Sequence, residues 1–262
     1  MNRDLFFQEL WDDFIKIAPQ AAAIKQRLEQ FGETVVNDHV AFRTFDRGPL
    51  RLDALEPLLL ALGYQAFDDY RFEDKHLRAR AYRCEGAPRI FLSELLLDEL
   101  SAPARAVLER CIGQIDSKAA TQASVFRAGR LWAPLAFAEY EALADESEYA
   151  GWLAALGMHA NHFTVSVNAL KKLTTLPSLL DFVEGAGYKL NTAGGRIKGT
   201  PEVLLVQGST LADRVQAQFA DGNHGIPSCY YEFALRYPAA DGRLYDGFVP
   251  ASADKIFEST HR

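Results

Sequence analysis

The strongest constraint on the fold is an order of expected elements that occurs twice along the chain. In each half, a strand leads to a leucine-rich helix that stops at a Gly-Tyr pair, and three more extended stretches follow. The first set lies at 39–45, 52–62, 65–72, 77–84 and 89–95, and the second at 162–168, 176–186, 189–193, 203–209 and 229–237. A repeated β-α-β-β-β order predicts an internal duplication, although few letters match between the halves.

These elements predict an α+β chain that forms one compact domain over residues 1–262. Its internal modules are expected at about 34–100 and 158–240, with a helical insertion at about 101–157. Further helices are expected at 1–19, at 21–31, from the capping residue Ser101 to about 115, and at 134–156. Two such modules, forming a curved mixed sheet around a pocket, resemble the vicinal-oxygen-chelate architecture.

Composition limits the partners. The net charge is −7, and Lys and Arg form no stripe, so neither nucleic acid nor a membrane surface is an expected partner. No apolar run reaches the roughly 18 residues of a membrane span, and acidic residues interrupt the N-terminal segment where a signal peptide would be apolar. Three scattered cysteines without a CxxC pair are typical of reduced thiols, so a cytoplasmic location is expected. The oligomeric state is left open.

Three expected strands each carry a metal-ligating residue near their start. His39 and His162 open the first strands of the two halves, and Glu232 lies on the last strand of the second. In a duplicated sheet that curls on itself, these positions converge. Two imidazoles and one carboxylate form the facial triad of non-haem iron enzymes, which leaves about three positions open on an octahedral ion. The sequence therefore predicts a metal site, with Fe(II) as the cofactor and Mn, Co, Ni or Zn possible in preparations.

Strand alternation places further side chains beside these ligands. Residues i, i+2 and i+4 of a strand share a face, so Arg43 and Ser166 are expected to point into the same pocket as the two histidines, and Arg236 to point in with Glu232. The opposite faces are more uniformly apolar. Two guanidiniums that face a metal pocket suit a carboxylate, so a small anionic substrate is expected, with Arg43 favoured over Arg236.

Glu94 leaves an alternative open. It lies on the last strand of the first half, much as Glu232 does in the second, and a glyoxalase-type site would use it as a fourth ligand. The triad is self-consistent without it, so Glu94 is placed outside the site.

Six motifs lie at 37–45, 146–152, 160–164, 194–199, 207–213 and 230–234. Together they resemble the 2-oxoadipate dioxygenase/decarboxylase family, also called hydroxyglutarate synthases. The resemblance implies an oxidoreductase that holds iron(II) with His39, His162 and Glu232, binds the substrate carboxylate with Arg43, and converts 2-oxoadipate and O₂ to 2-hydroxyglutarate and CO₂ in lysine catabolism. The notable departure is length, because well-characterised members carry additional C-terminal sequence.

The shorter chain leaves the distal carboxylate of the substrate without an assigned partner. Arg236 and Lys198 are candidates, and Asn161, Gln207 and Ser209 are expected in or behind the pocket. Two other functions stay open beside the dioxygenase. One is a redox-neutral metal isomerase, lyase or hydrolase of the same fold, and the other is a ligand-binding protein without catalysis.

Overall fold

The computed structural model describes residues 2–260 and contains an eight-stranded mixed sheet with the order β2-β3-β4-β1-β5-β10-β7-β6. Its strands are β1 (Asn37–Phe45), β2 (Gln65–Phe72), β3 (Leu77–Arg83), β4 (Arg89–Leu95), β5 (Ala160–Ser166), β6 (Lys198–Thr200), β7 (Leu205–Ser209) and β10 (Tyr230–Arg236). A separate hairpin consists of β8 (Arg214–Phe219) and β9 (Gly222–Pro227).

The sheet repeats one pattern on either side of its centre. β1 pairs in parallel with β4, β5 pairs in parallel with β10, and β1 meets β5 in antiparallel register. On each side, two further antiparallel strands complete four: β3 and β2 beyond β4, and β7 and β6 beyond β10. The predicted curved mixed sheet of vicinal-oxygen-chelate type is confirmed, and the first strand of each half lies at its centre.

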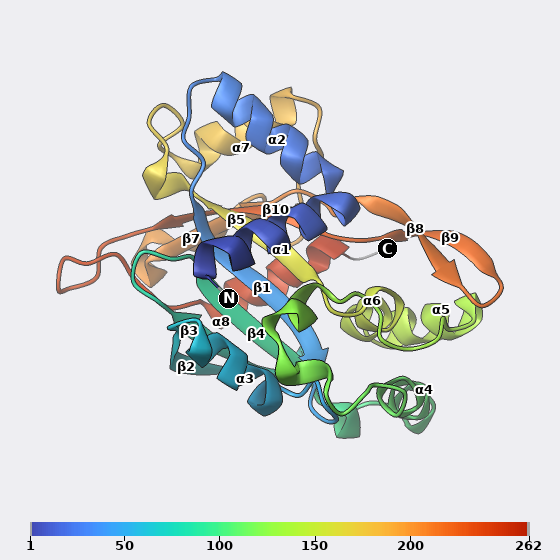
Figure 1. Cartoon of the computed structure of the whole chain (residues 1–262). Helices are drawn as coiled ribbons and strands as arrows, with labels where there is room; N and C mark the ends of the chain where they lie inside the picture. The colour runs from blue at the N-terminus through green and yellow to red at the C-terminus, as the bar shows by residue number, and fades with distance from the viewer. Residues whose placement is uncertain (1, 261–262) are drawn as a thin grey trace.

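Helices cover the outer face of the sheet and close its inner side. The α-helices are α1 (Arg3–Ile17), α2 (Pro19–Gln30), α3 (Leu52–Ala61), α4 (Ala102–Ile112), α5 (Phe137–Glu146), α6 (Glu148–Leu156), α7 (Leu176–Gly185) and α8 (Pro250–Phe257). α1, α2 and α7 pack on the second half of the sheet, and α3 packs on β3 and β4 (Figure 1). α8 contacts β2, β6 and β7, so it bridges the two edges of the sheet on the opposite side (Figure 1).

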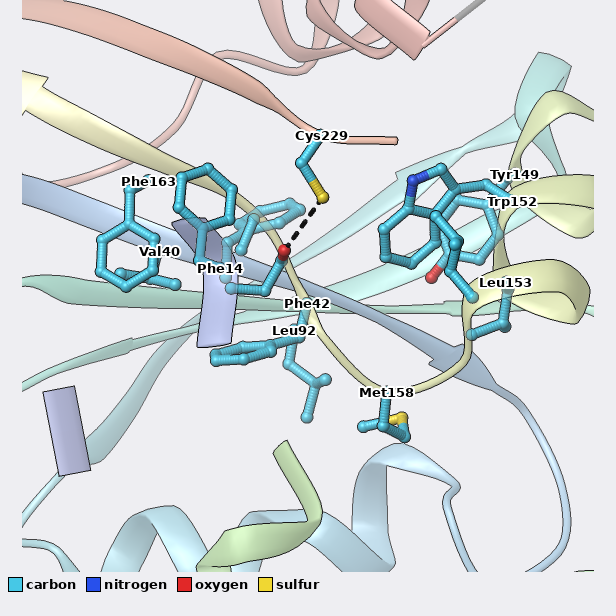
Figure 2. Packing of buried hydrophobic residues seen from close by; sticks show 14 of the residues in the cluster. Phe14, Val40, Phe42, Leu92, Tyr149, Trp152, Leu153, Met158, Phe163 and Cys229 are labelled. Atoms are coloured by element: carbon cyan, nitrogen blue, oxygen red, sulfur yellow. Dashed lines mark hydrogen bonds between the residues drawn. The ribbon is translucent and has the colours of Figure 1, made fainter. Parts of the chain in front are cut away.

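The outer face of the central strands carries the apolar core that the alternation predicts. Val40, Phe42 and Phe163 are fully buried there, and the Phe163 ring lies 5.0 Å from the ring of Phe14 on α1 (Figure 2). Tyr231 belongs to this face, with its ring 5.9 Å from that of Trp11. The inner face is thereby left to the polar side chains, including the candidate ligands.

One expectation about the second half is wrong, and other elements there were missed. A strand was expected at 189–193, but that stretch makes only an isolated bridge at Leu190, and the edge strand is β6 instead. The reason is local, because the Asn191 side chain accepts a hydrogen bond from the Ala193 backbone, and Gly194 and Gly195 follow with positive φ. The β8–β9 hairpin and α8 were also not expected.

Within the described part of the chain, no helix is both long and apolar enough to cross a membrane.

Candidate metal centre

His39, His162 and Glu232 converge at one point on the inner face. The Nε2 atoms of the two histidines lie 3.4 Å apart, the Glu232 carboxylate lies 3.5 Å from His39 Nε2 and 3.4 Å from His162 Nε2, and all three residues are buried. One ligand atom from each lies within 4.8 Å of the others. Within residues 2–260 this is the one group of three or more histidine, cysteine or acidic side chains that could hold a metal ion.

Strand register explains why the three side chains meet. His39 on β1 and Glu232 on β10 both pair with Thr164, which lies between them on β5. His162 lies two residues before Thr164 on the same strand and therefore shares its face. Two neighbouring rows of the sheet thus supply the ligands, and no loop is needed to bring them together.

A second layer of side chains orients each ligand. His39 Nδ1 donates to Asp38 Oδ1 at 2.7 Å, and His162 Nδ1 lies 3.1 Å from Asn161 Oδ1. Both contacts direct Nε2 toward the shared point, because the other ring nitrogen carries the proton. Gln207 Nε2 donates to Glu232 Oε1 at 2.6 Å and fixes the carboxylate. Asn161 and Gln207 therefore lie directly behind the candidate ligands, as expected from the sequence.

The electrostatics of the group fit a divalent cation. Burial raises the pKa of Glu232, although His39 and Gln207 oppose this, and burial lowers the pKa of His162, to which His39 and Arg43 add. Glu232 Oε2 is buried and has no hydrogen-bond partner within the described part of the chain. A buried carboxylate oxygen without a partner is costly, and a metal ion would satisfy it. Two nitrogen donors and one oxygen donor match the set that non-haem iron uses.

Arg43 lies two rows away from His39 on the same strand face. Its side chain is 1% exposed, donates to Glu148 Oε1 at 2.7 Å and to Thr260 Oγ1 at 3.1 Å, and lies over the rings of Tyr149 and Trp152. Figure 2 shows these two aromatic residues of α6. Burial disfavours the charged guanidinium, but Glu148 outweighs this effect and raises the pKa of Arg43, so the side chain remains a cation.

Comparison with known proteins shows to which family the chain belongs. The family model for 2-oxoadipate dioxygenase/decarboxylase matches residues 10–244. The chain belongs to the 2-oxoadipate dioxygenase/decarboxylase family. A protein of Arabidopsis thaliana named chloroplastic 2-oxoadipate dioxygenase/decarboxylase is 36% identical over 250 residues, which cover 85% of this chain and 67% of the relative. As a member of this family, the chain is an enzyme.

Solved structures share this fold. A crystal structure of the hydroxyglutarate synthase from Oryza sativa in complex with 2-oxoadipate has a TM-score of 0.89 and 32% identity, covering 98% of this chain and 93% of that one. A candidate hydrolase from Shewanella frigidimarina has a TM-score of 0.90 and 44% identity, covering 95% and 98%. A glyoxalase-superfamily protein from Ralstonia eutropha, 22% identical over 93% of this chain and 84% of that one, shares the fold with a TM-score of 0.79.

Arg236 forms an ion pair with Asp38 on the inner side of the sheet. Its Nε and Nη2 atoms donate to the Asp38 carboxylate at 2.7 and 2.9 Å, and Nη1 donates to the backbone oxygens of Tyr245 and Gly247. Asp38 also accepts a hydrogen bond from His39, so it connects Arg236 to this candidate ligand. A direct contact of Arg236 with substrate stays a prediction.

Glu94, the alternative ligand, lies away from the triad. Its carboxylate accepts from the Leu52 backbone N–H at the start of α3 at 2.7 Å and pairs with Arg78. It follows Ser93, whose hydroxyl contacts Tyr149 on the inner side, so alternation directs Glu94 toward the helices on the outer side. The same alternation that turns Glu232 inward therefore turns Glu94 outward.

The remaining candidates occupy the second half of the sheet. Lys198 is buried and donates to the Asn191 carbonyl at 2.6 Å, and Ser209 Oγ lies 2.8 Å from Ser259 Oγ. Ser166 lies at the end of β5 and is partly exposed. Burial lowers the pKa of Lys198 to about 8, with Glu232 acting in the opposite direction.

Sequence reasoning missed the residues after β10. Phe248 packs edge-on against His39 with ring centroids 4.9 Å apart, Ser259 contacts Ser209, and Thr260 contacts Arg43. The chain after Glu232 thus folds back over the site. The proline at position 250, followed by residues that favour a helix, was the signal that could have revealed α8.

Proposed function

We propose that this protein is a non-haem iron(II) dioxygenase that converts 2-oxoadipate and O₂ to 2-hydroxyglutarate and CO₂. The observation that carries the proposal is the buried His39–His162–Glu232 donor set in a chain of this family. The Oryza sativa relative crystallised with 2-oxoadipate supports the choice of substrate. The atoms balance, because the six-carbon oxo acid divides into a five-carbon hydroxy acid and CO₂ while both atoms of O₂ enter the products.

The residues of the centre each have a task in this reaction. His39, His162 and Glu232 would hold iron(II), which supplies the electrons for O₂ activation and a template for the chelating oxo acid. Asp38 and Asn161 keep the Nε2 atoms of the two histidines available, and Gln207 fixes one Glu232 oxygen. The buried surroundings exclude bulk water and so limit side reactions.

Two cations suit the charge of a 2-oxo dicarboxylate. Arg43 lies on the same face of β1 as His39, four residues further along the strand. Lys198 lies on β6, two strands from Glu232 on β10. An incoming carboxylate could replace the Thr260 hydroxyl as a partner of Arg43, or the Asn191 carbonyl as a partner of Lys198. Arg236 is less suited to this task because Asp38 already neutralises it.

The assignment of Lys198 predicts a pH dependence of substrate affinity. With a pKa of about 8, the ammonium is present below that pH and is lost as pH rises through it. The dissociation constant for 2-oxoadipate should therefore increase several-fold between about pH 7 and about pH 9. Calorimetric titration at several pH values measures this. Lys198→Met should bind 2-oxoadipate more weakly at neutral pH, and its affinity should no longer depend on pH in this range. An unchanged pH profile in this variant would show that Lys198 does not bind the substrate carboxylate.

The function is tested by O₂ uptake with a panel of 2-oxo acids, using iron-loaded protein under reducing conditions. We expect uptake with 2-oxoadipate, and less with 2-oxo acids that lack the second carboxylate. The redox-neutral alternative is kept because of the Shewanella frigidimarina relative named as a candidate hydrolase. Turnover by zinc- or nickel-loaded protein in anaerobic buffer would favour that alternative and contradict the dioxygenase.

A role in lysine breakdown and a cytoplasmic location belong to the same proposal. The first follows from the proposed substrate and product. The second stays a prediction from the sequence, since the Arabidopsis thaliana relative is named as chloroplastic. Fractionation of the source cells, followed by detection of the protein, would test the location.

A further inference from the structure

One buried polar group on the inner face has no task in the mechanism above. Tyr230 is the first residue of β10, two positions before Glu232, and its side chain is fully buried. Among the residues that the structure describes, its hydroxyl has no hydrogen-bond partner. Its ring stacks on the ligand His162, with centroids 4.7 Å apart and planes inclined by 23°. A buried hydroxyl without a partner is costly, so its orientation and surroundings are informative.

The register of the sheet locates Tyr230 between the metal centre and Arg43. Tyr230 pairs with His162, which pairs with Ala41, which pairs with Phe91, so these four residues form one row across the inner face. The triad row, with His39 and Glu232, lies on one side of it. The Arg43 row lies on the other side, about 13 Å from His39 along β1.

Within this row Tyr230 is the available hydrogen-bond donor. His162 is committed to the metal centre, and the side chains of Ala41 and Phe91 carry no hydrogen-bonding group. The side chain of Ala41, between the two charged rows, is a single methyl group. A substrate that reaches from the metal centre toward Arg43 passes over Ala41 and beside the Tyr230 phenol.

We propose that Tyr230 is a substrate-positioning residue, whose phenol hydroxyl donates a hydrogen bond to an oxygen of the bound 2-oxo acid between the metal centre and Arg43. This inference rests on the proposed function, because it needs a 2-oxo acid in this pocket. It goes further by assigning a neutral donor to the row between His39 and Arg43.

The next residue provides a matched control. Tyr231 is also fully buried, and its hydroxyl also lacks a hydrogen-bond partner in the described residues. It lies on the opposite face of β10, where its ring packs 5.9 Å from that of Trp11, away from the metal centre. An unpartnered hydroxyl alone therefore assigns nothing, and the position on the inner face distinguishes Tyr230. Replacing either tyrosine by phenylalanine removes one hydroxyl and leaves the ring.

The test is anaerobic calorimetric titration of the iron-loaded protein with 2-oxoadipate, in which binding is measured without turnover. Tyr230→Phe should raise the dissociation constant about 10- to 100-fold, the usual loss when a hydrogen bond to a charged group is removed. Tyr231→Phe should leave it within about twofold. Both variants should retain one iron per chain and the melting temperature of the wild type, which excludes an effect through His162 or through folding.

The outcomes separate this inference from the proposed function. If wild-type protein binds 2-oxoadipate and the two variants bind it equally well, Tyr230 only packs against His162 and the inference is wrong. If iron-loaded wild-type protein does not bind 2-oxoadipate, the proposed function and this inference both fail. A large loss confined to Tyr230→Phe supports the hydrogen bond.

Discussion

Glu232→Gln is expected to abolish tight metal binding while the fold survives. The amide keeps the size of the side chain and an oxygen near Gln207, but it removes the negative charge among three donors that lie within 4.8 Å of one another. A divalent cation held by two neutral imidazoles and an amide loses its only charged ligand. Metal content per chain after gel filtration should fall from about one to near zero, and added Mn²⁺ should no longer raise the melting temperature.

Glu94→Gln is the matched control for this result. Glu94 is a buried glutamate on β4, the strand of the first half that corresponds to β10. Its carboxylate accepts a hydrogen bond from the start of α3 and pairs with Arg78. Its loss should therefore lower the stability of the fold while metal content stays at one per chain. Retained stoichiometric metal in Glu232→Gln, or loss of metal in Glu94→Gln, would show that the ligand set is misassigned.

Asp38→Asn is expected to lower the free energy of unfolding by about 3–5 kcal/mol. Asp38 is 4% exposed and Arg236 is 2% exposed, and the pair is bidentate. The substitution leaves the Arg236 cation buried without its counter-ion, and it replaces one of the two oxygens that accept from Arg236 and His39 by an N–H donor. Urea unfolding measures the loss, and weaker metal binding should accompany it.

The pH dependence of this contribution follows from the same contacts. Burial disfavours the Asp38 carboxylate, but Arg236 and His39 outweigh burial and hold its pKa far below the usual range. A lowered carboxyl pKa gives stability that is complete above the pKa in the unfolded chain, about 3.9, and is lost only as pH falls further. The difference between wild type and Asp38→Asn should therefore be constant from about pH 5 to 8.

An exposed ion pair provides the comparison for Asp38. Asp241 contacts Arg243 at 2.8 Å on the surface, with side chains about half and nine-tenths exposed. Asp241→Asn should leave the urea midpoint of unfolding close to that of the wild type, because solvent screens the pair. Equal effects of the two substitutions would contradict a special role of burial at Asp38.

The triad could be predicted from the sequence because it depends on strand alternation and duplication. His39, His162 and Glu232 lie on regular strands, where two rows of the sheet fix their direction. The partner of Arg236 could not be predicted in this way, because Asp38 lies 198 positions away and the pair depends on how the two halves curl together. The covering segment after residue 247 was missed because few of its contacts are local, such as that between Thr260 and Arg43.

The most direct test of the central claim is turnover of 2-oxoadipate by the iron-loaded protein under ¹⁸O₂. A dioxygenase acting at the His39–His162–Glu232 centre should yield 2-hydroxyglutarate with one labelled atom in the new hydroxyl group and one in the newly formed carboxylate, together with CO₂ at one equivalent. Product without label, or an inert protein that still holds one iron per chain, would contradict the account.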